Sequence, residues 1–499
     1  MIAEETEDES LYQDGKIVRD ATALSGTLYL SQGIYIIRGF IIARFLGPSV
    51  YGVWSIFRSF LGSASFLGLG TQQAMRREVP FSIGEGNKRR KALIIQSSLS
   101  WNVLITSIVM VIVFLLSFTK AANQFATEVR LAGILFVLNA VHIFMRPKFN
   151  SEQKILLLSK YIMAYAILNT LFGLSFLYFF KLKGLLLGMI IAQFILLTYL
   201  VVNNHLSLKL SIDKNLLFEL FSIGFPIMIF SFIVFLMGNV DKYMVFAMLG
   251  RKMTGYYGLA AFASSAVGYI SYSMTNVVFP RMMYTYAKTG EIKDIEKYYI
   301  KPMFVLSGII PIILCIIYIN VKLILVYLLP SYLPGITVVR ILIISLFFST
   351  ILGLPTNLLI ALNKQKKFAI IMAIVLFLDV CIIFLAIKNG FGIKGVAFST
   401  TFFFALASTL ANIYALFLLK YKIRKISRKI LSIYWPFIYS FASMFLIISV
   451  SISNNVIIDH IIKSLVFLLL AFPLFIYIEK NSMIARKVFG LLHKFKNRR

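Results

Sequence analysis

The chain repeats one of its own segments, and this repeat constrains the fold more than any other feature of the sequence. Residues 45–52, FLGPSVYG, return without a gap as residues 248–255, MLGRKMTG, at an offset of 203 residues. At the same offset Arg38 corresponds to Asp241, so the two copies carry opposite charges at equivalent positions. The sequence therefore predicts a duplicated domain.

A second stretch repeats at slightly larger offsets. Val129-Arg130 and the apolar run after it match Val339-Arg340 and its run, and Gln153-Lys154 matches Gln365-Lys366, at offsets of 210 to 212 residues. The duplication then covers about six helices in each copy, and an even number of helices gives both copies the same orientation in a membrane.

Composition places the chain in a membrane. Hydrophobic residues make up 59% of the sequence and charged residues 14%, which leaves too little polar surface for a soluble globular protein. A helix needs ~20 residues to cross a hydrocarbon core of ~30 Å, and this length predicts an all-α, polytopic membrane protein with about fourteen spanning helices. We expect these helices near residues 23–46, 50–75, 92–118, 129–149, 155–180, 184–203, 217–249, 255–280, 301–319, 336–362, 368–387, 393–418, 432–452 and 459–478.

The distribution of basic residues predicts the orientation of these helices. The formal net charge is +30, and most Lys and Arg fall at the two ends of the chain and in alternate loops, with clusters at 88–91, 420–429 and 486–499. Basic loops stay on the cytoplasmic side, so both termini should be cytoplasmic and the clusters should face anionic membrane lipids. Because the charge follows the topology, nucleic acid is not an expected partner.

The residues needed for several kinds of chemistry are absent from the sequence. The four histidines, at 142, 205, 460 and 493, are far apart and no paired cysteines accompany them, so no metal site is expected. There is no phosphate-binding loop for ATP, and the loops are too short for a catalytic glycan-processing domain. We therefore expect no enzyme and no cofactor, and any active transport should be driven by Na⁺ or H⁺ or by a partner.

The repeat predicts a transporter architecture. Two parallel six-helix bundles, at 23–210 and 211–420, should face one another across a central cavity, with helices 13 and 14 at 421–480. Residues 1–22 should form a cytoplasmic N-terminal tail and residues 481–499 a basic cytoplasmic tail. Alternating access, in which one bundle rocks against the other, is the mechanism expected for this arrangement.

Several motifs resemble the polysaccharide transporter family of the multidrug/oligosaccharidyl-lipid/polysaccharide exporter superfamily. The first is the segment Ala43–Trp54 followed by Gly68-Leu69-Gly70, which looks like the family's opening signature. The later motifs are Gly224-Phe225-Pro226, Asp241-Lys242-Tyr243, Gly255-Tyr256-Tyr257, Phe279-Pro280-Arg281, residues 362–367 and residues 390–397. The resemblance covers about residues 20–420.

The resemblance implies a function. Members of this family are similar to Wzx-type flippases, which move polyprenyl-pyrophosphate-linked oligosaccharides from the cytoplasmic to the outer leaflet of the cell membrane. A lipid-linked oligosaccharide and membrane lipids are thus the expected partners, with polysaccharide-assembly proteins as further candidates. The alternative on the same fold is a cation-coupled exporter of drugs or metabolites, which should carry acidic groups for cationic substrates.

Charged residues inside the predicted helices are the candidate site residues, because a charge in a bilayer costs ~2.5–3.5 kcal/mol and needs a partner or water. Arg38, Arg58 and Lys242 are the candidates for substrate binding, since Arg binds phosphate oxygens with two parallel hydrogen bonds and Lys adds a point charge. Other roles stay open at this stage. Arg38 can pair with Asp241, and Arg58 can extend to the membrane surface.

Two acidic residues are candidates for a gate or for ion coupling. Asp241 is a candidate because it occupies the position that corresponds to Arg38 in the repeat. An ion pair between the two that opens when substrate phosphate arrives would act as a gate. Asp379 lies in the middle of an apolar helix, where it is either protonated, paired with a basic residue, or the site of a coupling ion.

Overall fold

The structure, a computed structural model, describes residues 2–119, 123–206 and 211–482, without the side chains of residues 2–22, of several residues between 264 and 287 and of residues 481–482. Helices joined by short connections form this described part of the chain, and it contains no strand. The helices are α1 (Ile2–Ser63), α2 (Thr71–Gly84), α3 (Lys88–Leu116), η1 (Asn123–Phe125), α4 (Ala126–Ser151), α5 (Ile155–Val202), α6 (Lys214–Met237), α7 (Val240–Thr289), α8 (Ile292–Leu328), η2 (Pro330–Gly335), α9 (Ile336–Ile351), α10 (Gly353–Ala361), α11 (Gln365–Lys388), α12 (Gly392–Leu418), α13 (Ile423–Ile448), α14 (Val456–Leu470) and α15 (Phe472–Ser482).

The prediction of an all-α, polytopic membrane protein is confirmed. Among the described residues, 11 helical segments are long and apolar enough to cross a membrane. Two segments are very long, 41 residues at Ala23–Ser63 and 48 residues at Ile155–Val202, and each combines two of the expected fourteen helices. Each of these two contains a break in the helical backbone, so each has the length for more than one crossing. The expected helix 255–280 lies in α7, which is not among the 11 segments.

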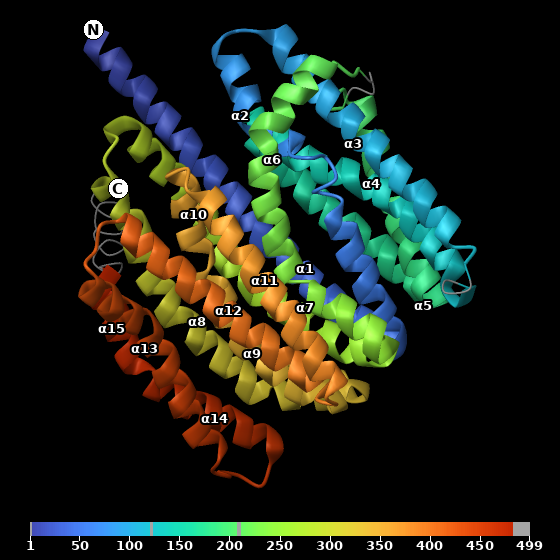
Figure 1. Cartoon of the computed structure of the whole chain (residues 1–499), viewed down its shortest axis with the longest axis vertical. Coiled ribbons are helices and arrows are strands. Elements are labelled where there is room, and N and C mark those ends of the chain that lie inside the picture. The colour runs from blue at the N-terminus through green and yellow to red at the C-terminus, as the bar shows by residue number, and fades with distance from the viewer. Residues whose placement is uncertain (1, 120–122, 207–210, 483–499) are drawn as a thin grey trace. The chain divides into compact units, whose positions relative to one another are not determined.

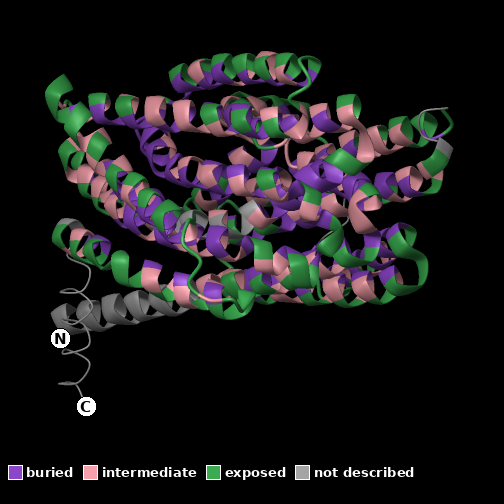
Figure 2. Ribbon diagram, turned by 90° about the horizontal axis from the view of Figure 1, so that it is seen from below, coloured by how far each residue is buried: buried purple, intermediate pink, exposed green. Residues whose placement is uncertain are grey.

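Apolar side chains on the outer faces of the helices are suited to lipid. Figure 2 shows buried and exposed residues mixed along the same helices. The exposed ones include Phe179, Phe218 and Leu469, which are 72%, 72% and 75% exposed. In water such surfaces would drive aggregation, but in a bilayer they face a solvent as apolar as they are.

The repeated segment forms the same backbone turn in both copies. Gly47 in α1 has φ 66° and ψ 170°, and Gly250 in α7 has φ 81° and ψ −180°. Only glycine takes this combination without steric strain, because it has no Cβ. The sequence repeat is therefore a repeat of one helix-reversing residue, and the run before each glycine forms one helix and the run after it another.

The α5 segment contains a second kind of reversal, at a residue that is not glycine. Lys181 has φ 49° and ψ −129°, and the two halves of α5 pack against each other. A Cβ at Gly184 would lie 1.9 Å from the carbonyl oxygen of Phe176, and one at Gly188 would lie 2.2 Å from that of Phe172. The Gly184-x-x-x-Gly188 motif is therefore a packing motif that brings two helix backbones into contact.

Left-handed residues recur at corresponding turns of the two copies. Among the described residues, five pairs of residues with positive φ follow the order of the repeat, namely Gly47 and Gly250, Gly86 and Gly290, Gln153 and Asn363, Lys181 and Gly390, and Asn204 and Lys420. One detail differs from the sequence alignment. Gln153 corresponds in conformation to Asn363 rather than to Gln365, because Lys154 N–H and Lys364 N–H close the same turn onto Phe149 and Leu359.

The second predicted helix, 50–75, is not continuous. The helix α1 ends at Ser63, a turn follows, and α2 begins at Thr71. Leu69 and Gly70 have φ 48° and 92°, which ends the helical hydrogen-bond pattern, and a Cβ at Gly70 would lie 2.2 Å from the carbonyl carbon of Gly224. This turn lets α2 approach α6 at two facing glycines, so Gly224 serves close packing.

Three further predicted segments are also divided. The segment 217–249 breaks at Gly238 and Asn239, between α6 and α7, while 336–362 becomes α9 and α10 and 459–478 becomes α14 and α15. Gly238 ends α6 because it caps the last turn with its N–H on the Phe235 carbonyl.

Contacts between Cα atoms divide the chain into two compact units, residues 1–246 and 247–499. In the first unit α4 packs against α3 and α5, and α2 against α3 and α6; in the second, α9 packs against α8 and α12, and α11 against α12 (Figure 1). The helices after the duplication, α13 to α15, pack against α8. The predicted boundary between the two six-helix bundles, at residue 210, is placed from the sequence repeat, whereas these units are defined by contacts. The bundle boundary stays a prediction.

The predicted tails fall largely beyond what the structure describes. The basic tail at 481–499 lies outside the described residues from residue 483 onward. The side chains of the predicted N-terminal tail, 1–22, lie outside them as well.

The packing of α5 gives a first testable prediction. Gly184→Ala adds one methyl group against a backbone carbonyl and should lower stability by about 1–3 kcal/mol. Gly33→Ala makes the same change on α1, where no atom lies within 4 Å, and should leave stability unchanged or raise it by up to about 1 kcal/mol. Thermal unfolding of both variants in detergent measures the difference. Equal effects of the two substitutions would contradict the packing of the α5 halves.

Candidate functional site

The first unit holds a cation inside the helix bundle. Arg38, on α1 before the reversal at Gly47, is 8% exposed and packs against α5. A Cβ at Gly173 of α5 would lie 3.2 Å from Arg38 Nη2 and 3.4 Å from Leu185 Cδ1. The absence of a side chain at Gly173 thus leaves the space that the guanidinium occupies.

The guanidinium of Arg38 is not neutralised by its surroundings. Within the part of the chain that the structure describes, its buried Nε and Nη2 have no hydrogen-bond acceptor. The charged or titratable groups near it are Tyr35, Tyr165 and Arg58, none of them a carboxylate. Buried donors without acceptors are rare in proteins, and for a charged group they are costly.

The reversal at Gly47 brings the second predicted cation back toward the first. Arg58 follows Gly47 on α1, and its charge acts on both Arg38 and Lys242. Arg58 is exposed and Lys242 is half-buried. The three cations predicted for substrate binding therefore form one group, here called the cationic cluster, defined as Arg38, Arg58 and Lys242.

Lys242 is fixed by polar groups at the break between α6 and α7. Its Nζ donates to Asn239 Oδ1 at 2.6 Å and to Ser59 Oγ at 3.1 Å, and Ser59 Oγ in turn donates to Asn239 Oδ1 at 2.8 Å. Asn239 Nδ2 donates to the Phe235 carbonyl at 2.8 Å. The end of α6 at Gly238 is thus what places an amide oxygen within reach of the ammonium.

Asp241 lies beside Lys242 rather than beside Arg38. It is 4% exposed, its Oδ1 accepts from the Lys242 backbone N–H at 2.8 Å, and its charge acts on Lys242. Among the described contacts of Arg38 there is none with Asp241, although a pair between them is one of the alternatives that the sequence leaves open. A gating role for Asp241 stays a prediction.

A buried polar network next to Arg38 was not predicted from the sequence. Gln193 Nε2 donates to Tyr165 OH at 3.1 Å, and Tyr165 OH donates to Asn139 Oδ1 at 3.0 Å. His142 Nε2 lies 3.0 Å from the Gln193 carbonyl, an acceptor, so Nε2 carries the proton and Nδ1 accepts from Tyr161 OH. The signal for this network is present in the sequence, because Tyr161, Tyr165 and Asn169 recur every four residues along an apolar helix.

The electrostatics of the cationic cluster favour an anion. Two unit charges about 8 Å apart repel by ~2 kcal/mol at an effective dielectric constant of ~20. The cluster has three cations with Asp241 as the neighbouring carboxylate, and two donor nitrogens of Arg38, Nε and Nη2, have no acceptor among the described residues. A phosphate group that accepted these donors would relieve both the repulsion and the desolvation of Arg38.

Asp379 lies in the second unit, on α11. It is 2% exposed, and its Oδ1 accepts from Ser399 Oγ of α12 at 2.7 Å. A buried carboxyl with a hydroxyl donor can hold a proton or a small cation. Within the described residues no group of three His, Cys, Asp or Glu side chains is placed to hold a metal ion.

One comparison with known proteins shows the family of the chain, and another shows its fold. The sequence pattern of the polysaccharide biosynthesis protein family matches residues 17–286. The structure is similar to an inward-facing multidrug resistance MATE family transporter of the MOP superfamily, with TM-score 0.65 and 14% identity over 80% of this chain and 95% of that chain. It is similar to the lipid II flippase MurJ in an inward closed conformation, with TM-score 0.65 and 15% identity over 92% of this chain and 99% of that chain.

A third solved structure of the same superfamily is a transporter from Pyrococcus furiosus, with TM-score 0.51 and 16% identity over 80% of this chain and 95% of that chain. At these identities the solved structures show a common fold. No curated protein matches the chain.

The hydrogen bonds of Lys242 give a second prediction. Lys242→Met and Asn239→Leu should each lower the free energy of unfolding, and the double variant should lose about 1 kcal/mol less than the sum, because both remove the same bond. Lys160→Met, at an exposed lysine of α5, is the control. Its effect should add to that of Asn239→Leu within about 0.5 kcal/mol. Additivity of the Lys242 pair in denaturant titrations would show that the bond does not form.

Proposed function

The chain belongs to the polysaccharide biosynthesis protein family, and from this membership we propose that it is a flippase for a polyprenyl-(pyro)phosphate-linked oligosaccharide. Translocation across the cytoplasmic membrane would supply cell-surface polysaccharide synthesis. The fold it shares with MOP-superfamily transporters supports movement of a substrate rather than a catalysed reaction. Both termini would be cytoplasmic, and polysaccharide-assembly proteins are candidate partners.

One observation carries the substrate proposal. Arg38 is buried among α1 and α5 with two N–H donors unused, beside Arg58 and Lys242. A phosphate or pyrophosphate group is an anion whose oxygens match the guanidinium fork, so it would satisfy both donors at once. The glycan attached to it needs hydrogen-bonding groups, and the polyprenyl chain can stay in lipid.

The network of α4 and α5 would hold Arg38 in position for this contact. Tyr165 lies near the guanidinium and is itself fixed by Gln193 and Asn139. A side chain held by packing and hydrogen bonds loses less conformational entropy when it binds a ligand. Arg38 would thus be the binding residue, and Tyr165 a positioning residue.

A cation-coupled exporter is the second candidate function, because Asp241 and Asp379 are both buried carboxyl groups. The cationic cluster weighs against a cationic drug as substrate, since three positive charges would repel it. We propose that Asp379 instead contributes to coupling by Na⁺ or H⁺.

Replacement of Arg38 tests the flippase proposal. Arg38→Gln should slow transfer of a labelled polyprenyl-pyrophosphate oligosaccharide between liposome leaflets by about tenfold to a hundredfold, because a hydrogen bond to a charged group contributes ~1.5–3 kcal/mol. Arg38→Lys keeps the positive charge but lacks the two parallel N–H donors, so its transfer rate should lie between those of Arg38→Gln and the wild type. The transfer is measured as the fraction of glycan that becomes accessible to an added glycosidase.

Arg44→Gln is the matched control, because Arg44 lies on the same helix with an exposed side chain. It should transfer the substrate at the wild-type rate. Wild-type transfer by Arg38→Gln would remove the cationic site from the proposal. If the wild type transfers no glycan and instead exports a drug driven by a cation gradient, the exporter would be favoured.

Replacement of Asp379 tests ion coupling. Asp379→Asn keeps the hydrogen bond from Ser399 but cannot ionise, so uphill transport driven by a Na⁺ or H⁺ gradient should be lost. Exchange of substrate down its own gradient should continue, and this serves as the internal control. If the variant keeps gradient-driven transport, Asp379 takes no part in coupling.

A further inference from the structure

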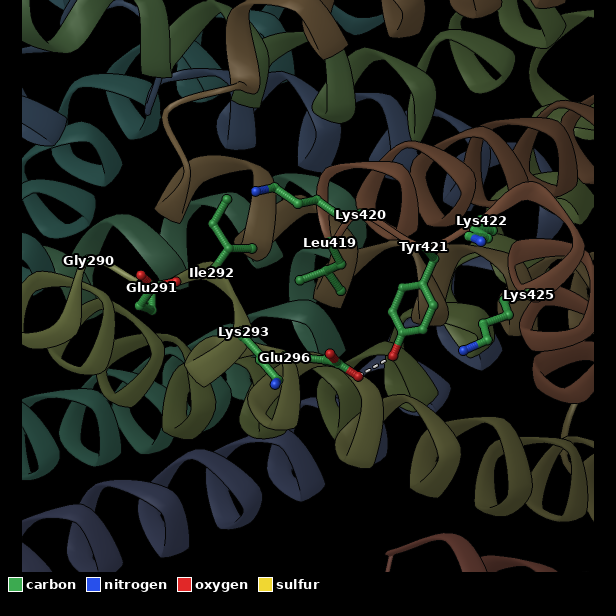
Figure 3. A pocket seen from close by; sticks show the side chains of 10 residues that line it. All are labelled: Gly290, Glu291, Ile292, Lys293, Glu296, Leu419, Lys420, Tyr421, Lys422 and Lys425. Atoms are coloured by element: carbon green, nitrogen blue, oxygen red, sulfur yellow. Dashed lines mark hydrogen bonds between the residues drawn. The ribbon is translucent and has the colours of Figure 1, made fainter.

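The second unit contains a cavity that the transport proposal does not use. Its volume is about 620 Å³, and it lies where the connection from α7 to α8 meets the connection from α12 to α13 (Figure 3). Four lysines line it, at 293, 420, 422 and 425, together with Glu291 and Glu296. The apolar side chains of Ile292 and Leu419 and the ring of Tyr421 complete the wall.

The carboxylates of the cavity do not neutralise these lysines. Glu296 accepts a short hydrogen bond from Tyr421 OH, drawn as a dashed line in Figure 3, and burial together with Glu296 raises the pKa of this phenol. In the part of the chain that the structure describes, none of the four lysines forms an ion pair. The cavity is therefore lined by four cations and two carboxylates, an excess of two positive charges.

The corresponding place in the first copy is also lined by lysines, but most of them are ion-paired. A cavity of about 420 Å³ lies there between the start of α3 and the connection from α5 to α6. The residues Asn204 and Lys420, which lie at the same left-handed turn of the two copies, each line one of the two cavities.

In this first cavity one carboxylate forms ion pairs with three lysines. Glu152 lies 3.0 Å from Lys91, 3.1 Å from Lys148 and 3.4 Å from Lys154. Burial alone would raise the pKa of Glu152, but the three lysines outweigh it and lower the pKa, so the carboxylate stays charged. In the first cavity a carboxylate is thus paired with the lysines, whereas in the second no described ion pair joins Glu291 or Glu296 to the four lysines.

We propose that the second cavity binds a phosphate-bearing anion through Lys420, Lys422 and Lys425. Lysine ammonium groups bind phosphate as point charges, and three of them around one cavity match a doubly charged group. The ligand takes the electrostatic role that Glu152 has in the first copy. The apolar wall suits the glycerol part of an anionic phospholipid, and a free pyrophosphate shares the same charged chemistry.

The experiment compares two sets of lysines in the second unit. The test variant carries Lys420→Gln, Lys422→Gln and Lys425→Gln, and the control carries Lys364→Gln, Lys366→Gln and Lys367→Gln. All six side chains are exposed, the control lysines line neither cavity, and both variants lose the same charge. Size-exclusion profiles check that both fold.

Two probes distinguish the sources of the anion. Inorganic pyrophosphate is titrated calorimetrically into the protein in detergent, and retention of phosphatidylglycerol against phosphatidylcholine is measured by native mass spectrometry. We expect wild type and control to bind at least one probe and the test variant to bind it at least tenfold more weakly. If the test variant loses affinity for phosphatidylglycerol alone, the site binds a lipid headgroup. If it loses affinity for pyrophosphate alone, the site binds a soluble anion.

The proposal is overturned if wild type binds neither probe or if the control loses as much affinity as the test variant. Unchanged binding by the test variant overturns it as well. If the triple variant does not fold, Lys425→Gln alone, compared with Lys367→Gln alone, should still weaken binding about threefold. Equal affinities of these two single variants would likewise contradict the proposed site.

Discussion

The reversal at Gly47 is the constraint on which the cationic cluster depends. In a continuous helix, Arg38 and Arg58 would lie about 30 Å apart, because each residue advances the helix by ~1.5 Å. The left-handed glycine turns the chain back, and the charge of Arg58 then acts on Arg38. The position of the cations therefore follows from a backbone requirement for glycine, and a side chain at position 47 would disturb the site without touching any charge.

The two copies share their turns but differ in their buried polar groups. Asn169 and Asp379 are separated by the same number of residues as the corresponding turn residues Gln153 and Asn363, so they occupy equivalent positions in the two copies. Both are buried. Asn169 accepts from Gln193 across the α5 hairpin at 3.5 Å, and Asp379 accepts from Ser399 across α11 and α12 at 2.7 Å. Duplication thus preserved a buried acceptor between paired helices, and divergence made it an amide near the cations of one copy and a carboxyl in the other.

Helix content could be predicted from the sequence, because it follows from hydropathy. Arg38, Arg58 and Lys242 could be selected as candidates from the cost of charge in lipid, and their binding role stays a prediction. The break after Ser63 could not be predicted, since it depends on Gly70 meeting Gly224 on another helix. The network around Tyr165 was missed for a similar reason. Single polar residues in apolar helices become a network only when packing places them side by side, and their spacing alone does not name their partners.

The unsatisfied guanidinium of Arg38 has a thermodynamic consequence for the whole first unit. Removing a cation from water costs several kcal/mol, and part of this is recovered only if an acceptor reaches its N–H groups. Without a ligand the cost is carried by the packing of α1 against α5, which holds Arg38 over Gly173. An anion that binds there recovers the cost and so favours the conformation that holds it. If Arg38 binds the substrate as proposed, occupancy of the site and the conformational equilibrium of the helices would be linked through this one side chain.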